Sequence, residues 1–301
     1  EHLYQKKFAM KKLIALTFAA FCTAAFLSYS YKTPAPQPLT PECYVSCFTS
    51  EIMDQFKAEA STASFAMMHD NPIPYVAADP LGKAVTFKAA DGSNAMGYEI
   101  RSKKKSNKWL FVIQEWWGLN DYIKKESETY YNDLEDVNVI ALDLYDGKIA
   151  ATADSAMKLI QSVKTDRLES IIKGAIAYAG TDAKIYTVGW CFGGMWSLQS
   201  TLLAGKQAAG CVMFYGRPEN NVEKLKTLNC DVIGFFGNKD RSPSPEVVNK
   251  FEADMQAAGK KLIANKYDAG HGFANPSNPV FNKEAAADAH AKAVAFLKER
   301  M

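Results

Sequence analysis

The sequence lacks an excess of either charge. Its 301 residues include 35 lysines and arginines against 33 aspartates and glutamates. Such a balanced chain offers no electrostatic attraction to nucleic acid or to an anionic membrane. We therefore expect neither as a partner. Hydrophobic residues make up 48% of the chain, which is typical of a globular protein with a sizeable core.

Histidine is scarce, and no apolar run is long enough to predict a membrane span. No histidine pair or second cysteine pair lies near Cys43 and Cys47, and no second histidine offers a ligand set, so we expect neither a metal nor another cofactor. The apolar run Leu13–Leu27 is shorter than the roughly 20 residues that cross a bilayer. Because it follows Met10-Lys11-Lys12, it is typical of a cleaved export signal. We expect residues 1–30 to be removed, and the protein to be periplasmic or secreted, without a stable membrane span.

Cysteines are few, and their number outside the signal is odd. Cys43 and Cys47 lie close together, and the sequence leaves open whether they form a disulfide or remain free thiols. They belong to an N-terminal extension, residues 31–80. Four prolines between residues 34 and 41 predict a linker there, and Glu51–Met68 predicts one helix.

Residues 81–301 predict an α/β fold, with a mostly parallel central sheet and helices on both faces. An antiparallel hairpin is expected first, with strands at Ala84–Phe87 and Met96–Ile100 around Asp91-Gly92-Ser93. Buried strands then alternate with amphipathic helices. The strands are Trp109–Ile113, Val137–Leu142, Lys184–Val188, Cys211–Phe214, Val232–Phe236 and Leu262–Lys266. The helices are Tyr122–Leu134, Thr152–Ser162, Arg167–Ala179, Met195–Leu203, Pro245–Ala258 and Glu284–Lys298.

The segment Gly189-Trp190-Cys191-Phe192-Gly193 is a nucleophile elbow with cysteine in the place of serine. It follows a strand and opens a helix, so the turn lifts the sulfur out of the sheet. We expect the helix N-terminus to lower the thiol pKa and favour the thiolate. A cysteine merely buried in a glycine-rich turn is the alternative.

An acid and a histidine follow the elbow in the order found in α/β-hydrolases. Asp240 comes after the strand Val232–Phe236, and His271 comes after the strand Leu262–Lys266. The histidine would carry the proton, and the carboxylate would orient its ring. His271 alone among the histidines lies at a strand's carboxyl end, where ligands bind in such sheets. The others lie before the signal, in the extension (His69) and on the C-terminal helix.

The loop Gln114–Gly118 follows the first parallel strand and completes the predicted site. In this fold, one oxyanion-hole amide comes from that loop and the other from the residue after the nucleophile, which here are Trp116 and Phe192. Glu115 would then lie beside the sulfur. A carboxylate repels a thiolate, so we interpret it as the group that accepts the thiol proton when substrate enters.

Together these motifs resemble the dienelactone hydrolase family. The resemblance covers about residues 83–301 and includes Asp143-Leu144-Tyr145 and Ala269-Gly270-His271-Gly272-Phe273. It implies a triad of Cys191, Asp240 and His271, with Glu115 coupling substrate entry to thiol activation. The implied reaction is acyl transfer to the sulfur, followed by hydrolysis of the thioester.

The arginines with which founding members of that family bind a substrate carboxylate are not matched. One of their places holds Asn275, and no arginine occurs between Arg101 and Arg167. A neutral or bulkier small ester or lactone is therefore expected, and Trp117 and Trp190 are candidates for binding it. A thioesterase or acyltransferase on the same triad, and a binding protein with an idle triad, are the alternatives. We expect a monomer or a small homo-oligomer.

Overall fold

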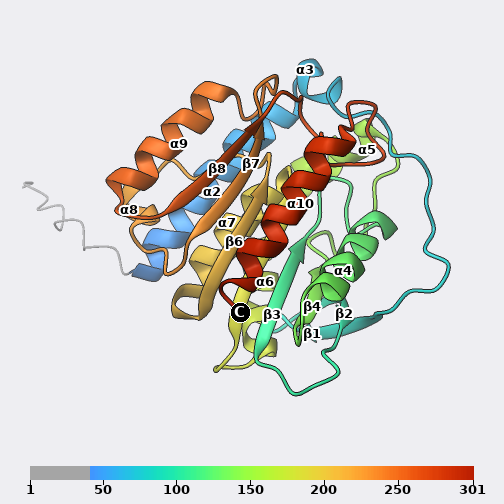
Figure 1. Ribbon diagram of the computed structural model, residues 1–301, viewed down its shortest axis with the longest axis vertical. Coiled ribbons are helices and arrows are strands. Elements are labelled where there is room, and N and C mark those ends of the chain that lie inside the picture. Colours follow the sequence, from blue (N-terminus) through green and yellow to red (C-terminus); the bar gives the residue numbers. More distant parts are fainter. Residues whose placement is uncertain (1–40) are drawn as a thin grey trace, which may run out of the picture. The chain divides into compact units, whose positions relative to one another are not determined.

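An eight-stranded sheet forms the centre of the molecule. The computed structural model describes the backbone of residues 41–301 and the side chains of residues 51–301. The strand order is β1-β2-β4-β3-β5-β6-β7-β8 (Figure 1). The strands are β1 (Lys83–Lys88), β2 (Asn94–Ile100), β3 (Lys108–Ile113), β4 (Asn138–Leu142), β5 (Lys184–Trp190), β6 (Ala208–Phe214), β7 (Val232–Gly237) and β8 (Leu262–Tyr267). β1 and β2 form an antiparallel hairpin, β2 is also antiparallel to β4, and the remaining neighbours are parallel.

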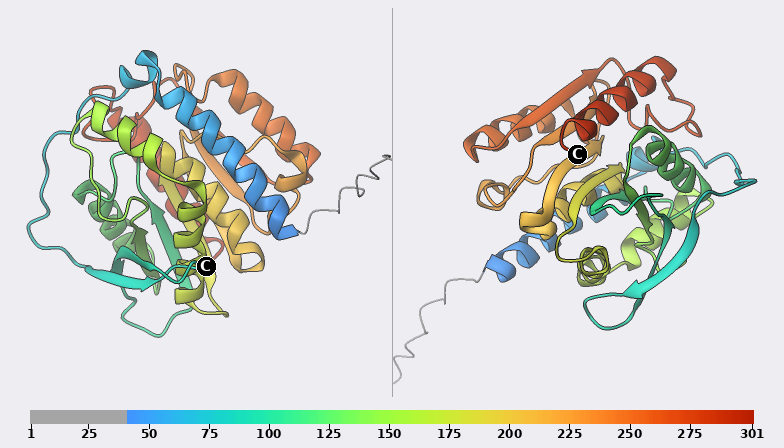
Figure 2. Two further views of the ribbon diagram at one scale, coloured as in Figure 1. Left: turned by 180° about the vertical axis from the view of Figure 1, so that it is seen from behind. Right: turned by 60° about the horizontal axis from the view of Figure 1, so that its bottom comes forward.

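Helices cover both faces of the sheet, which explains why β4 and β7 are apolar runs buried along their whole length. α4 and α10 lie on the face toward the viewer in Figure 1, and α5, α6 and α7 lie on the other face (Figure 2). The helices are α2 (Pro41–Ala60), α3 (Ala63–Ala66), α4 (Asp121–Asp133), α5 (Ala153–Ser162), α6 (Thr165–Ala179), α7 (Phe192–Ala204), α8 (Val222–Leu225), α9 (Pro245–Ala257) and α10 (Lys283–Lys298). None of the helices in this part of the chain is both long and apolar enough to cross a membrane.

The α/β architecture predicted from the sequence is confirmed. Every strand and helix expected in residues 81–301 is present, with boundaries that shift by up to three residues. The single helix expected at Glu51–Met68 is wrong. α2 begins at Pro41, where proline suits the first helical turn. It ends at Ala60 because the Thr62 hydroxyl accepts a hydrogen bond from the Phe65 amide and starts α3. The export signal, the prolines before residue 41 and the Cys43–Cys47 pairing lie outside the described residues and side chains.

The N-terminal extension, from residue 41 on, packs against the α/β domain and belongs to the same compact unit. α2 lies across α5, α6 and α7, and the Phe56 ring packs on the Phe192 ring with centroids 5.6 Å apart. Glu59 forms an ion pair with Arg217 at 3.0 Å and accepts a hydrogen bond from the Ser242 hydroxyl at 2.7 Å. These contacts hold α3 and the residues after it over the carboxyl ends of the strands. The chain then runs around the edge of the domain to β1 (Figure 1).

Candidate active site

Cys191 occupies a sharp turn between β5 and α7. Its backbone has φ 54° and ψ −117°, a conformation that residues other than glycine rarely adopt and that clusters at functional sites. Glycines two residues away on each side make the turn feasible. A Cβ on Gly189 would lie 2.1 Å from the Gly193 carbonyl oxygen, and a Cβ on Gly193 would lie 2.3 Å from the Ile113 carbonyl oxygen. The strand-to-helix turn expected from the sequence is therefore present, with the thiol at the start of α7.

Asp240 and His271 come together as the sequence predicts. They lie in the loops after β7 and β8, and Asp240 Oδ2 is 2.8 Å from His271 Nδ1. The other Asp240 oxygen accepts a hydrogen bond from the Ser242 amide at 2.8 Å, which fixes the carboxylate. Because Nδ1 donates to the carboxylate, Nε2 is the nitrogen that faces the sulfur. It is buried and has no hydrogen-bond partner among the described residues.

The pKa of the Cys191 thiol is raised, whereas the sequence predicts a lowered value. Burial raises the pKa of Cys191, and this outweighs the lowering by His271 and by the Phe192 amide at the helix N-terminus. The expectation of a lowered thiol pKa is therefore wrong, since the side chain is only 2% exposed. Burial also disfavours charge on His271, but the charges of Asp240 and Cys191 and the hydrogen bond to Asp240 raise its pKa well above the usual value. Asp240 thus stabilises the imidazolium that forms when His271 takes a proton.

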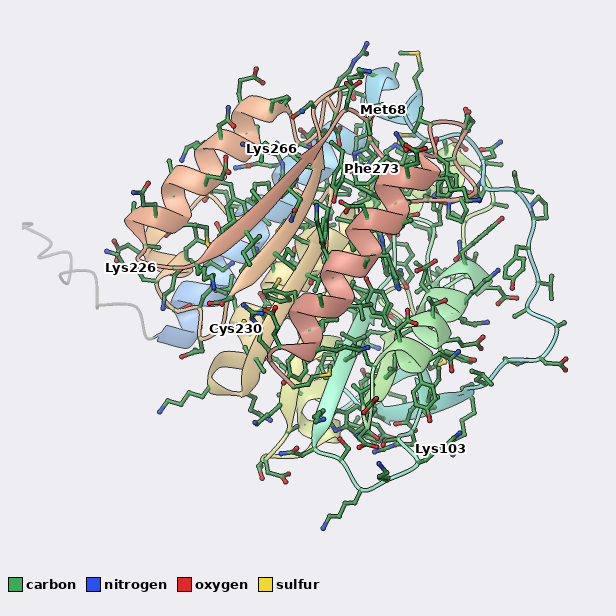
Figure 3. The ribbon with its side chains drawn as sticks, in the orientation of Figure 1. Met68, Lys103, Lys226, Cys230, Lys266 and Phe273 are labelled. Carbon is green, nitrogen blue, oxygen red and sulfur yellow. The ribbon has the colours of Figure 1, made fainter. Side chains whose placement is uncertain are left out.

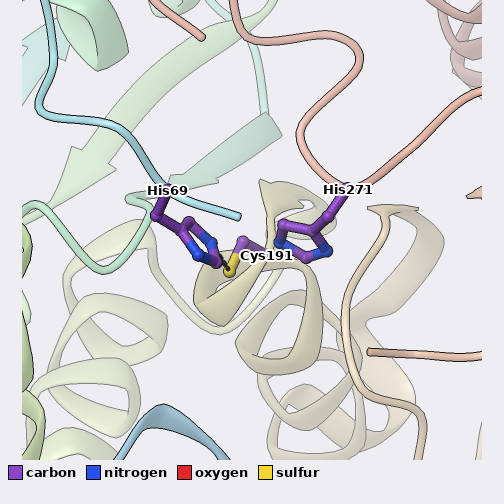
Figure 4. A group of neighbouring side chains, drawn as sticks. All are labelled: His69, Cys191 and His271. Carbon is purple, nitrogen blue, oxygen red and sulfur yellow. Dashed lines mark hydrogen bonds between the residues drawn. The ribbon is translucent and has the colours of Figure 1, made fainter. Parts of the chain in front are cut away.

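A second histidine, which the sequence pattern did not place in the site, also lies at the sulfur. His69 follows α3 in the extension, and its Nε2 is 3.6 Å from Cys191 Sγ (Figure 4). Its Nδ1 lies 2.8 Å from the Phe65 carbonyl oxygen and donates to it, so Nε2 carries no proton in the neutral ring. Burial, together with the charge of His271, lowers the pKa of His69 well below its usual value. The ring stacks on Phe65 with centroids 4.3 Å apart.

The extension covers the site at the carboxyl ends of the strands. Met68 and Phe273 lie at the same end of the molecule in Figure 3, and the Asn278 amide donates to the Met68 carbonyl oxygen at 3.3 Å. The His69 ring centroid lies 4.7 Å from that of His271 and 4.5 Å from that of Trp116. His69, Cys191 and His271 are buried. Part of the structure that shields them from water is the extension, which lies outside the hydrolase domain expected from the sequence.

Glu115 lies at the same end of the sheet but is held by other partners than the thiol. Asn275 Nδ2 donates to one oxygen at 2.7 Å, and the Tyr215 hydroxyl lies 3.5 Å from the other. No hydrogen bond joins Glu115 to Cys191 within residues 51–301. Burial raises the pKa of Glu115 to about 7, against the lowering effects of His271, Asn275 and Tyr215. Asn275 therefore holds the glutamate at this end of the sheet.

The aromatic residues predicted to bind substrate differ in position. Trp190 lines a small cavity of about 30 Å³ together with Glu115, Tyr215 and Asn275. Trp117 does not line it, and its ring packs on Trp116 with centroids 4.9 Å apart. The loop that carries Trp116 touches the elbow, because Gly193 lies against the carbonyl oxygens of residues 113 and 114. This contact places the two predicted oxyanion-hole segments side by side.

The raised pKa of Glu115 leads to a testable effect on stability. In the unfolded chain the carboxyl has its ordinary pKa of 4.5, whereas in the folded protein burial raises its pKa to about 7. The folded state therefore binds more protons, and stability is lost as the pH rises from 4.5 to 7. We expect Glu115→Gln to match the wild type near pH 4.5 and to exceed it by up to about 3 kcal/mol at pH 8. Urea unfolding at several pH values measures this.

Glu284→Gln, at an exposed position on α10, is the matched control. Its stability should stay within about 0.5 kcal/mol of the wild type at every pH. A Glu115→Gln difference that does not grow between pH 5 and pH 8 would show that the carboxyl titrates normally in the folded protein.

Three comparisons with known proteins bear on this site. The chain is 28% identical over 235 residues to protein usf of Aquifex pyrophilus, covering 73% of this chain and 99% of that protein. It is 28% identical over 152 residues to a carboxymethylenebutenolidase of Pseudomonas sp. strain P51, covering 48% of this chain and 61% of the enzyme. The crystal structure of the dienelactone hydrolase-like promiscuous phosphotriesterase P91, from metagenomic libraries, superposes with a TM-score of 0.62 at 18% identity. That superposition covers 73% of this chain and 99% of P91 and supports the fold.

Residues 96–301 match the model of the dienelactone hydrolase family. His69 and the rest of the extension lie before the matched residues. Because the match covers well over half of the chain, this protein belongs to the dienelactone hydrolase family and is a hydrolase of carboxylic esters or lactones.

Proposed function

We propose that Cys191 is the nucleophile of this hydrolase, with His271 as its general base and Asp240 as the group that orients the base. The observation that supports it most is the 2.8 Å contact between Asp240 Oδ2 and His271 Nδ1. It fixes the ring so that Nε2 faces a thiol on a strained strand-to-helix turn.

The proposed reaction has two steps. His271 Nε2 takes the thiol proton while the sulfur adds to the ester or lactone carbonyl carbon, and the imidazolium then protonates the departing alkoxide oxygen. This leaves a thioester on Cys191. In the second step His271 removes a proton from water, the hydroxide adds to the thioester carbon, and the thiol leaves with the proton. A lactone would keep its alcohol and acid in one product.

Each tetrahedral intermediate carries a negative oxygen that must be stabilised. We assign this role to the backbone amides of Trp116 and Phe192. The Phe192 amide begins α7, where the helix dipole favours negative charge. Two such donors in a buried site contribute strongly, because removal of a single donor in comparable enzymes lowers kcat by about 10²–10³-fold.

Glu115 has a pKa near the pH at which it would act, so it can change protonation state during the reaction. We propose that it relays the thiol proton: it accepts the proton when substrate displaces the side chains around the sulfur, and passes it to His271, which delivers it to the departing alkoxide. Its hydrogen bonds to Asn275 and Tyr215 hold it at the end of the sheet until then.

The substrate is proposed to be uncharged at the group next to the reacting carbonyl. The cavity beside Glu115 is lined by two carboxylates, Glu115 and Glu126, and by no lysine or arginine of the described residues. In their ionised form these two carboxylates repel an anionic substrate, because charges in a buried site are poorly screened. A small neutral ester or lactone fits this lining better than an acid does.

A matched pair of substrates tests this proposal. A neutral activated ester and an analogue that carries a carboxylate should differ by at least about 10-fold in kcat/KM, in favour of the neutral ester, since one unpaired buried charge costs more than about 1.4 kcal/mol. Intact-mass analysis during turnover should detect an acyl group on Cys191. An added alcohol or thiol acceptor separates hydrolysis from acyl transfer by its products. A preference for the acidic ester, or an acyl group on another residue, would contradict the proposal.

A further inference from the structure

His69, Cys191 and His271 meet at one point although they come from three distant segments of the chain. One ligand atom from each residue lies within 4.8 Å of the other two, and all three side chains are buried (Figure 4). Their exposed fractions are 6%, 2% and 4%. Two imidazoles and a thiol are the side chains that bind zinc and related transition metals most readily.

Both imidazoles are already oriented as metal ligands. His271 donates from Nδ1 to the Asp240 carboxylate, and His69 donates from Nδ1 to the Phe65 carbonyl oxygen. Histidines that bind metals nearly always donate their second ring nitrogen to a carboxylate or a backbone carbonyl in this way. In each ring the remaining nitrogen, Nε2, is therefore the one free to coordinate. The His271 Nε2 atom is buried with no hydrogen-bond partner in the described structure.

The separation of the ligand atoms fits a tetrahedral site. With Zn–S of about 2.3 Å and Zn–N of about 2.0–2.1 Å, a tetrahedral angle puts sulfur and nitrogen about 3.5 Å apart. The Cys191 Sγ to His69 Nε2 distance is 3.6 Å. No pair of the three atoms is more than 4.8 Å apart, so a shift of His271 of no more than about 1.5 Å would bring its nitrogen to the separations of a tetrahedral site.

An aromatic wall surrounds the three ligands. The rings of Phe65 and Trp116 pack against His69, and the ring of Tyr215 packs edge-on against His271. An apolar shell strengthens binding of a cation to a thiolate because it lowers the local dielectric constant. It also holds both imidazole planes, so little side-chain entropy would be lost on binding.

We propose that His69 Nε2, Cys191 Sγ and His271 Nε2 together bind one Zn²⁺ ion, and that this binding reversibly inhibits the hydrolase. On binding, the S–H bond breaks, its proton passes to solvent, and an S–Zn bond forms, with water as the fourth ligand. The metal site stands on the three side chains alone. Its inhibitory effect rests on the proposed role of Cys191 as the nucleophile. The ion is coordinated by the sulfur lone pair that would otherwise attack the ester.

The site depends on the extension. His69 lies before the residues that the family model matches, so the ligand set is complete only when the extension packs over the elbow. The bound ion would join the extension to the elbow that carries Cys191 and to the loop that carries His271. Zn²⁺ should therefore raise the midpoint of thermal unfolding, because it binds only the folded arrangement.

The test is a titration of the chelator-treated protein with Zn²⁺ in competition with a coloured zinc indicator. We expect one ion per chain in the wild type. His69→Ala and Cys191→Ser should each weaken binding by about 100-fold or more, since loss of an outer-shell partner alone weakens metal sites 10–100-fold. Co²⁺ should give the intense charge-transfer absorption of a thiolate ligand in the wild type and none in Cys191→Ser.

His290→Ala is the matched control, because His290 is also a histidine bonded to a carboxylate, Asp133, but lies on α10 away from the sulfur. It should bind Zn²⁺ as the wild type does. His69→Gln replaces His69→Ala if the alanine variant does not fold by circular dichroism. No binding by the wild type, or binding that both His69 and Cys191 variants retain, would overturn the site.

Hydrolysis is measured in the same samples. Zn²⁺ should inhibit the wild type with the affinity found by titration, and a chelator should restore activity. Tight binding at these three residues without inhibition would keep the metal site and refute the nucleophile. If the wild type hydrolyses no ester, the titration by itself still decides whether the three residues bind the metal.

Discussion

Replacing Cys191 with alanine is expected to lower kcat/KM for ester or lactone hydrolysis by at least about 10³-fold. Loss of the nucleophile removes the covalent pathway, and in comparable triads it costs more than loss of the orienting acid. Alanine keeps the Cβ and the strained backbone at φ 54°, so the elbow itself should persist. Initial rates on neutral activated esters and unsaturated lactones, with circular dichroism of both proteins, measure the effect.

Cys230→Ala is the control for loss of a thiol elsewhere. Cys230 is half-buried and lies just before β7, at the opposite end of that strand from the loop that carries Asp240. Its removal should change kcat/KM by less than about 2-fold, because Cys230 precedes β7 whereas the triad lies at the carboxyl ends of the strands. Equal hydrolysis by Cys191→Ala and the wild type would refute the cysteine mechanism while leaving the family assignment intact.

The sequence predicted the fold of residues 81–301 because its central strands, β3 to β7, are buried on both faces. Runs such as Val232–Gly237 are apolar throughout, and Ser244 and Asn282 cap the helices that follow. Signals of this kind are local and need no knowledge of packing. The order of the strands in the sheet depends on contacts between segments that are distant in the chain. The sequence pattern therefore predicted only that most strands are parallel.

The triad could also be found from the sequence, since each member directly follows a strand at the same edge of the sheet. His69 could not. It follows a four-residue helix, and nothing in its neighbourhood indicates that α2 carries it across the domain. Phe65, one helical turn earlier, becomes buried against Trp116 only in the folded protein. The pKa of Cys191 was mispredicted for the same reason, because the burial that raises it comes partly from the extension.

Removing the charge of Lys224 is expected to destabilise the protein by about 3–5 kcal/mol. Lys224 and Glu219 form an ion pair at 2.9 Å with side-chain exposures of 0% and 1%. Lys224 also donates to Gln199 Oε1 at 2.6 Å, and Glu219 accepts the amides of Asn220 and Asn221. In Lys224→Met the methionine fills the same space, but the carboxylate remains buried without its counterion. The midpoint of urea unfolding at constant slope measures the loss.

Lys226→Met separates this effect from a general loss of positive charge. Lys226 lies two residues away and pairs with Glu223 at 2.7 Å, but the side chains are 49% and 61% exposed. Water screens that pair, so its loss should cost less than about 1 kcal/mol. The double variant Glu219→Gln/Lys224→Met should recover part of the stability lost in Lys224→Met, because it removes the unpaired carboxylate. If the two lysine variants were equally stable, or if the double variant recovered nothing, the buried charge would not be the cause. Stability at this position would then depend on the packing of the side chain and not on its charge.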